Sequence, residues 1–259
     1  MRYWRVLFRN LATWLSAEMA YREDFLAAVL TALITTAGRV FALWGMFTAG
    51  VDFGGWRFEE ALLVVGAAVV LMGAFAGLVE PNLSAFSRRV FQGTLDFVFL
   101  KPLDTQFLIM FERVSLWGLP DLVAGTWLIV AAAQRLGLSL AAVLALLGGL
   151  GCAALLFYLL AFGAALVAVR SMYVSNLLHF LAAFLQAAQY PATAYGRGFR
   201  WIFTFFVPVY WMTQVPVEVV LGRVSGALFL ALGFWLALAL AASRLALRLA
   251  MRSYTSASS

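Results

Sequence analysis

Seven long apolar stretches decide what this chain can fold into. Each approaches or exceeds the roughly 20 residues that an α-helix needs to cross the hydrocarbon core of a bilayer. The stretches cover residues 25–51, 61–79, 114–134, 136–169, 171–196, 201–217 and 224–243. Only 12% of the residues are charged, against about 25% in a typical soluble domain. The sequence therefore predicts an all-α integral membrane protein, with a single transmembrane domain over residues 1–259.

The distribution of Lys and Arg predicts six crossings rather than seven. If residues 201–217 do not cross, 12 of the 18 Lys and Arg lie on the side of the two termini and five lie on the other. Cytoplasmic loops carry the excess of Lys and Arg, so both termini are expected in the cytoplasm. A seventh crossing would place the arginines of the tail outside. We expect a multi-pass protein of the plasma membrane (the inner membrane of a bacterium), with spans at residues 25–50, 60–80, 114–134, 140–169, 171–190 and 224–246.

Residues 199–221 form the apolar stretch that is not expected to cross. Pro208 and Pro216 lie in it, and proline inside a helix removes a hydrogen bond and clashes with the preceding turn. We expect two short helices, near residues 199–207 and 210–221. Broken backbone at membrane depth is tolerated where it packs against protein. The prediction is an external re-entrant element between spans 5 and 6; the alternative is a short helix lying flat on the membrane surface.

The two ends of the chain are expected outside the hydrocarbon core. Within residues 1–23, Trp4, Leu7 and Leu11 share one helical face and Arg2 and Arg9 lie on another. That pattern predicts a basic amphipathic helix in the membrane interface; the alternative is a soluble helix packed on a partner. Residues 247–259 are expected to form a cytoplasmic tail.

Residues 81–104 form an unusually aromatic cytoplasmic segment. Pro81 is typical of the first turn of a helix, and Leu83, Phe86 and Val90 then share one face. A further apolar run ends at Leu100, before Lys101 and Pro102. Exposed apolar patches of this kind mark interaction surfaces. Either the membrane surface or a partner protein is expected to cover the segment.

Arg39 is the costliest residue of the predicted spans. An arginine at mid-span costs about 3 kcal/mol on insertion scales. Its position in the outer half of the first span matches the depth of Glu59 and Glu60 better than that of Asp121. Arg39 therefore either extends outward to these two glutamates or is a charge that lines a substrate path.

Gly73 and Gly77 are spaced four residues apart in the second span. Small residues at this spacing allow two helix backbones to approach closely. Gly66 extends the row toward the start of the span. The pattern predicts a helix-packing face.

Several site motifs are missing from the sequence. It contains no Gly-x4-Gly-Lys-Ser/Thr phosphate-binding loop and no Gly-x-Ser-x-Gly nucleophile turn. The single cysteine, Cys152, allows no intrachain disulfide. Two rival functions remain open. One is an ATP-independent channel or transporter, for which the polar candidates are Arg39, Asp121, His179, Gln186 and Gln189; the other is a membrane enzyme, which would need clustered acids or histidines.

The order of these elements, together with three sequence patterns, resembles the permeases of type-2 ABC exporters, in a branch once catalogued as a domain of unknown function. The first pattern is Gln92-Gly93-Thr94-Leu95-Asp96-Phe97-Val98-Phe99-Leu100-Lys101-Pro102-Leu103. The second is Tyr190-Pro191, then Phe206-Val207-Pro208, Val215-Pro216 and Leu221-Gly222-Arg223. The third is the end of the chain, from Arg252-Ser253-Tyr254 onward. The resemblance covers nearly the whole chain.

The resemblance implies a transport subunit without catalytic chemistry of its own. Residues 81–104, here called the coupling segment, would dock into a separate ATPase subunit that holds ATP and Mg. The expected coupling residues are Leu83, Phe86, Arg88, Arg89, Val90, Phe91, Asp96, Lys101 and Pro102. Pro191, Pro208 and Pro216 would belong to the external re-entrant element. A second permease, identical or related, and membrane lipid are the other expected partners, and neither nucleic acid nor a bound cofactor or metal is expected.

Overall fold

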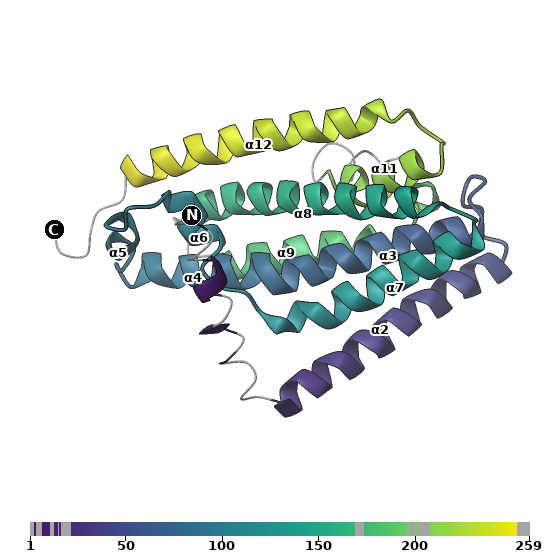
Figure 1. The fold of residues 1–259 in the computed structure, drawn as a ribbon, viewed down its shortest axis with the longest axis horizontal. Helices are drawn as coiled ribbons and strands as arrows, with labels where there is room; N and C mark the ends of the chain where they lie inside the picture. Colours follow the sequence, from purple (N-terminus) through teal and green to yellow (C-terminus); the bar gives the residue numbers. More distant parts are fainter. Residues whose placement is uncertain are drawn as a thin grey trace.

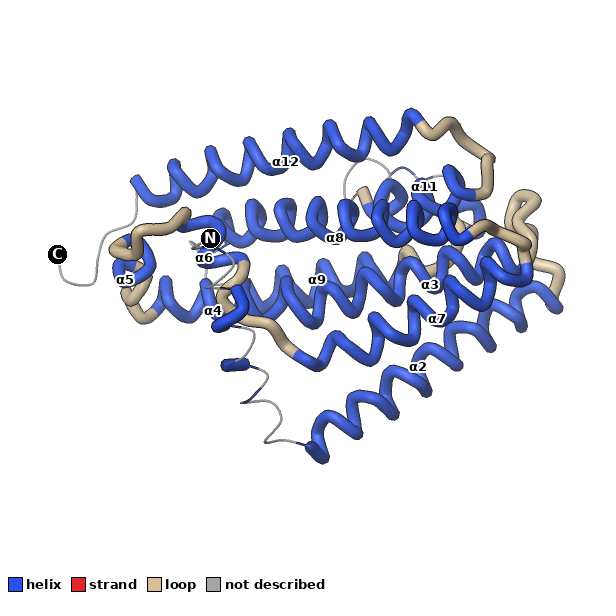
Figure 2. The backbone as a smooth tube through the Cα atoms, viewed as in Figure 1, coloured by secondary structure: helices blue, strands red, loops and turns tan. Residues whose placement is uncertain are grey.

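A computed structural model describes residues 3, 7–10, 13–14, 16, 22–168, 174–195, 198, 201 and 208–252. Helices joined by loops account for these residues, and Figure 2 shows no strand among them. Apolar backbone that must satisfy its own hydrogen bonds in a bilayer is restricted to helices and closed barrels. The all-helical prediction is confirmed for this part of the chain.

Five helices of the described residues are long and apolar enough to cross a membrane. They are α2 (Arg22–Thr48), the continuous run of α3 (Phe58–Ala74), η1 (Phe75–Val79) and α4 (Glu80–Phe91), then α7 (Leu119–Arg135) with its preceding turn η2 (Leu116–Gly118), α8 (Leu140–Ala168) and α12 (Ala227–Arg252). A sixth apolar helix, α9 (Val174–Ala187), is shorter. The chain is therefore a multi-pass membrane protein.

The short elements gather at the two ends of the long helices (Figure 1). Helices α4, α5 (Asp96–Phe99) and α6 (Thr105–Met110) lie at the same end as the last turns of α12. The turn η4 (Ala192–Ala194) and helix α11 (Val209–Val220) belong to the stretch before α12, and Figure 1 shows α11 at the opposite end. Below, these are called the coupling end and the opposite end.

The second predicted span and the coupling segment form one continuous helix. A π-helical turn, η1, joins α3 to α4, and Pro81 lies in the first turn of α4. Because this helix is continuous, proline at residue 81 removes one internal hydrogen bond, and the carbonyl oxygen of Gly77 instead accepts from the backbone N–H of Ser115 at 2.8 Å. The chain therefore leaves the helix only after Phe91, and not at the expected end of the span at residue 80.

Helix α11 corresponds to the second short helix expected, near residues 210–221, and Pro216 does not interrupt it. Pro216 lies inside α11, whereas Pro208 directly precedes that helix. Pro216 is buried beside Gly149 of α8, where a Cβ on the glycine would lie 3.4 Å from the proline ring. The close approach of α8 compensates for the lost hydrogen bond by packing. The helix expected at residues 199–207 falls largely outside the described residues.

The ends of the chain differ in how far they can be followed. Helix α12 continues to Arg252, beyond the expected end of the last span at residue 246. The rest of the predicted tail lies outside the described residues. Most of the predicted N-terminal helix also lies outside the described residues. Those of its residues that are described are helical.

A seam of glycines joins α3 to α7. A Cβ on Gly73 would lie 2.7 Å from the carbonyl oxygen of Gly118, and one on Gly125 would lie 2.8 Å from that of Gly66. Gly77 approaches Gly118 in the same way. The two backbones are in direct contact along this seam, which is the arrangement that small residues at four-residue spacing allow.

Gly125→Ala should destabilise the protein by forcing α3 and α7 apart. Overpacking of this kind costs about 1–3 kcal/mol, which would lower Tm by about 2–4 °C for each kcal/mol in a chain of this size. Thermal unfolding in detergent measures the effect. Gly151→Ala in α8 is the matched control, because a Cβ there meets nothing within 4 Å. Equal Tm values for the two variants would contradict the seam.

Candidate coupling site and external polar network

The coupling segment buries the face that the sequence predicts to be exposed. Leu83 and Phe86 are only 0% and 3% exposed. Phe86 packs against Phe162 of α8, with ring centroids 6.0 Å apart. The expectation that a membrane or partner must cover Phe86 is therefore wrong, because α8 covers it. Val90 is partly buried against the same core.

The exposed apolar side chains of the segment lie further along the chain. Phe91, Phe97 and Leu100 are 48%, 67% and 80% exposed, and Lys101 and Pro102 beside them are exposed as well. The chain reverses at Gly93, where φ is 65°, a value that glycine adopts at little cost. Val98 is buried and anchors this second half of the segment to the core.

Charges of the segment interact with the loop before α7. Arg89 forms an ion pair with Glu112, and the amide of Asn82 bonds both the carbonyl oxygen and the N–H of Arg113, at 2.7 and 2.8 Å. Burial, followed by the nearby charge of Arg88, lowers the pKa of Arg113 from its ordinary value. The loop and α4 thus form one unit, with Arg88 left exposed.

Hydrogen bonds attach the end of the coupling segment and α6 to two long helices. The Tyr158 hydroxyl of α8 donates to the carbonyl oxygen of Met110 at 2.6 Å. The Gln106 amide donates to the Ser243 hydroxyl of α12 at 2.8 Å, and Arg244 lies 3.8 Å from Asp104. Displacement of the segment would therefore act directly on α3, α8 and α12.

Described residues of the N-terminal region contact the same loop. The Trp14 indole donates to the carbonyl oxygen of Glu112 at 3.0 Å, and the Asn10 amide donates to that of Phe111 at 3.1 Å. The guanidinium of Arg113 lies 4.7 Å from the centre of the Trp14 ring. Sequence periodicity gave no sign of these contacts, because it identifies an apolar face but not its partner.

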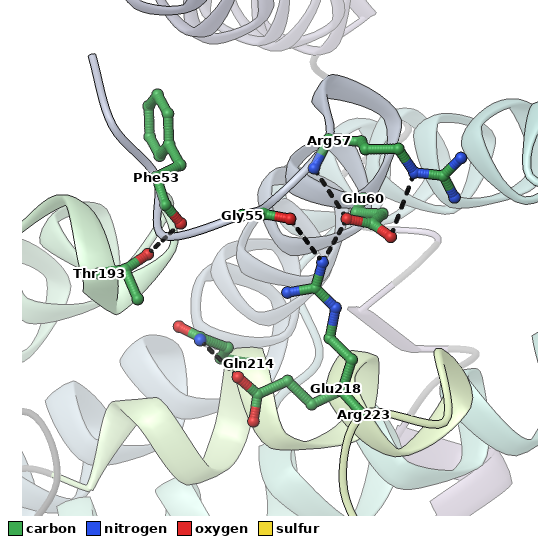
Figure 3. A network of polar contacts seen from close by, with 8 residues as sticks. All are labelled: Phe53, Gly55, Arg57, Glu60, Thr193, Gln214, Glu218 and Arg223. Carbon is green, nitrogen blue, oxygen red and sulfur yellow. Dashed lines mark hydrogen bonds and ion pairs between the residues drawn. The ribbon is translucent and has the colours of Figure 1, made fainter.

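At the opposite end, Glu60 is the centre of a polar network (Figure 3). Its carboxylate accepts hydrogen bonds from the backbone N–H and the guanidinium of Arg57 and pairs with Arg223. Arg223 also donates to the carbonyl oxygen of Gly55 and lies 4.3 Å from the centre of the Trp56 ring. The network ties the start of α3 to the turn between α11 and α12.

A second branch of the network holds α11. Gln214 accepts from the N–H of Ala192 at 2.7 Å and donates to Glu218 at 2.8 Å. Thr193 donates to the carbonyl oxygen of Phe53 at 2.7 Å. These bonds fix the turn η4 between α11 and the loop after α2. Pro191, which we expected to belong to the re-entrant element, directly precedes this turn.

Arg39 does not reach Glu60, whose two carboxylate oxygens have the partners given above. Its Nη1 atom is buried and has no hydrogen-bond partner among the described residues. The same holds for one carboxylate oxygen of Asp121 and the hydroxyl of Thr36. Arg39 interacts electrostatically with Asp121, but no ion pair within 4.0 Å joins them.

The described residues offer no group of three His, Cys, Asp or Glu side chains that could hold a metal ion.

Glu60→Gln should destabilise the opposite end of the molecule. The change leaves the partly buried Arg223 without its anionic partner, and an unsatisfied charged group costs about 1–3 kcal/mol. A lowered Tm in detergent is the expected result. Glu59→Gln, the neighbouring acid, for which the described residues provide no ion pair, is the control. If both variants have the same Tm as the unmodified protein, the network contributes nothing to stability.

Comparison with known proteins places these features in a family. Neither the search of curated proteins nor that of solved structures gives a match. The family model described as "ABC-2 family transporter protein" matches residues 33–258, which include every long helix described above except the first turns of α2. The chain belongs to the ABC-2 family of transporter proteins.

Proposed function

We propose that this chain is the transmembrane permease of an ABC exporter and is driven by a separate ATPase subunit. The observation that carries the proposal is the construction of the coupling segment. Its first part, to Phe91, is continuous with α3 and packs on α8 through Phe86, and Asp104 at its end lies 3.8 Å from Arg244 of α12. The segment also presents Phe97 and Leu100 to the surroundings. An apolar patch on a rigid support is what a docking interface requires.

The segment would act as a lever between the ATPase and the long helices. ATP and Mg would be held by the ATPase, and closure of that subunit would move the docked segment. The Arg89–Glu112 pair and the Asn82 bonds make the segment and the loop before α7 move as one body. The bonds of Tyr158 and Gln106 would carry the motion to α8 and α12. Arg88 and Lys101 would contribute positive charge at the interface.

The proposed topology has six crossings and cytoplasmic termini. The five long helices supply five crossings, and residues 171–190, which contain α9, supply the other. Helix α11, with 12 residues, is not counted as a crossing, because a seventh crossing would place the arginines of the tail outside. Placed outside the cell, it is the re-entrant element that the Glu60 and Gln214 contacts hold in place. A second permease would complete the path for the exported substrate.

Phe97→Asp combined with Leu100→Asp should abolish association with the ATPase. The two side chains are exposed, so the acids disturb no core, and a charge facing an apolar interface is left unpaired. The measurement is vanadate-sensitive ATP hydrolysis in the complex purified through a tag on this chain from its native membranes. Val51→Asp, also an exposed apolar residue but at the opposite end, is the matched control. Full ATPase activity with the double variant would overturn the coupling assignment, and flux without ATP in vesicles of this chain alone would favour the channel.

Cysteine labelling should place the two ends of the molecule on different sides of the membrane. In a Cys152→Ala background, Lys101→Cys should react with a membrane-impermeant maleimide only after the cells are opened. Val51→Cys should react with intact cells. The reverse pattern would overturn the topology, because the coupling segment must face the cytoplasm to meet an ATPase.

A further inference from the structure

A crevice of about 950 Å³ lies between α2 and α7. Its lining is almost wholly apolar and includes Val29, Leu33 and Trp44 of α2 and Val123 and Trp127 of α7. This volume is at the upper end of the roughly 300–1,000 Å³ of small-molecule sites. In Figure 1, α2 diverges from α7 toward its own N-terminal end.

The crevice opens to the hydrocarbon layer and not to water. Both helices are candidate spans, and Leu33, Val123 and Trp127 on its walls are exposed on the outside of the chain. Its lining extends from Phe25 to Trp44, about 28 Å along α2 at 1.5 Å per residue. That length is close to the thickness of the hydrocarbon core, about 30 Å.

The two helices do not form a closed interface along this crevice. The Thr36 hydroxyl lines it, is buried and lacks a partner, whereas Thr31 and Thr35 on the same helix bond to carbonyl oxygens of the preceding turn. Arg39 and Asp121, on the two helices, interact at a distance without pairing. The unsatisfied Thr36 hydroxyl is consistent with an open space between the two helices at this depth.

One charged residue, Arg135, lies at one end of the crevice. Arg135, in the last turn of α7, is exposed and lines the crevice at the opposite end. Trp44 lies on the other wall, and tryptophan is typical of the membrane interface. A long apolar trough with an arginine at its interfacial end is complementary to an acyl chain joined to a phosphate, because arginine binds phosphate in a planar, two-pronged geometry.

We propose that the α2–α7 crevice is a binding site for a membrane glycerophospholipid, with an acyl chain between the helices and the phosphate at Arg135. The site goes beyond the proposed function, because a bound lipid requires neither an ATPase nor export. A bound chain holds α2 away from α7.

Photo-crosslinking in vesicles tests the site. The full chain is reconstituted in phosphatidylglycerol vesicles that contain a trace of phospholipid with a diazirine on its acyl chain, and labelled peptides are quantified by mass spectrometry. Val123→Trp and, separately, Ala131→Phe fill the crevice and should each reduce labelling of α2 and α7 by about tenfold. Leu230→Trp on the exposed face of α12, which also meets bulk lipid, should leave it unchanged. Arg135→Gln should reduce it by several-fold, with the apolar walls intact.

Three results would overturn the site. The first is labelling of α2 and α7 no stronger than that of the exposed face of α12, which would indicate bulk lipid only. The second is unchanged labelling in both crevice-filling variants, given that each remains monodisperse and keeps the Tm of the unmodified protein. The third is disulfide formation between two permeases through Val123→Cys in the Cys152→Ala background, which would show that a second protein fills the crevice.

Discussion

Direct contact between the backbones of α3 and α7 is the constraint on which the rest of the structure depends. Gly66, Gly73, Gly118 and Gly125 carry no Cβ at the contact, so the two helices approach as closely as helices can. Without a hydrophobic driving force between helices in lipid, such packing is a principal source of association. Helix α3 is therefore fixed at the centre, and the coupling segment, the Glu60 network and α2 are positioned relative to it.

The two ends of α3 are held by different kinds of interaction. At the opposite end, charged groups on Glu60, Arg57 and Arg223 join the start of α3 to the turn between α11 and α12. At the coupling end, aromatic packing attaches the extension of α3 to α8, and single hydrogen bonds attach the nearby α6 to α8 and α12. Helix α3 is thus held at its far end by a charge network and along its length by the backbone of α7.

The sequence identified the membrane class, the long helices and one side of the glycine seam, because each depends on local composition or spacing. It could not identify Gly118 and Gly125 as partners of Gly73 and Gly66, since pairing between helices is not encoded in either helix alone. The same reason explains the error on Phe86. An apolar helical face on a loop predicts that something covers it, and here α8 returns to do so. The pairing of Glu60 with Arg223 was missed because 163 positions separate the two residues.

The π turn of residues Phe75–Val79 has a consequence for the orientation of the coupling segment. One surplus residue in a helix rotates everything after it by about 100°. If α3 and α4 formed an unbroken α-helix, the face of α3 that carries Gly73 would continue onto a different side of α4 from the one observed. The extra residue thus selects which flank of α4 is turned toward α8, and leaves the arginines on the other. Such turns occur often at functional positions of helices, and here a single inserted residue sets the rotational phase between α3 and α4.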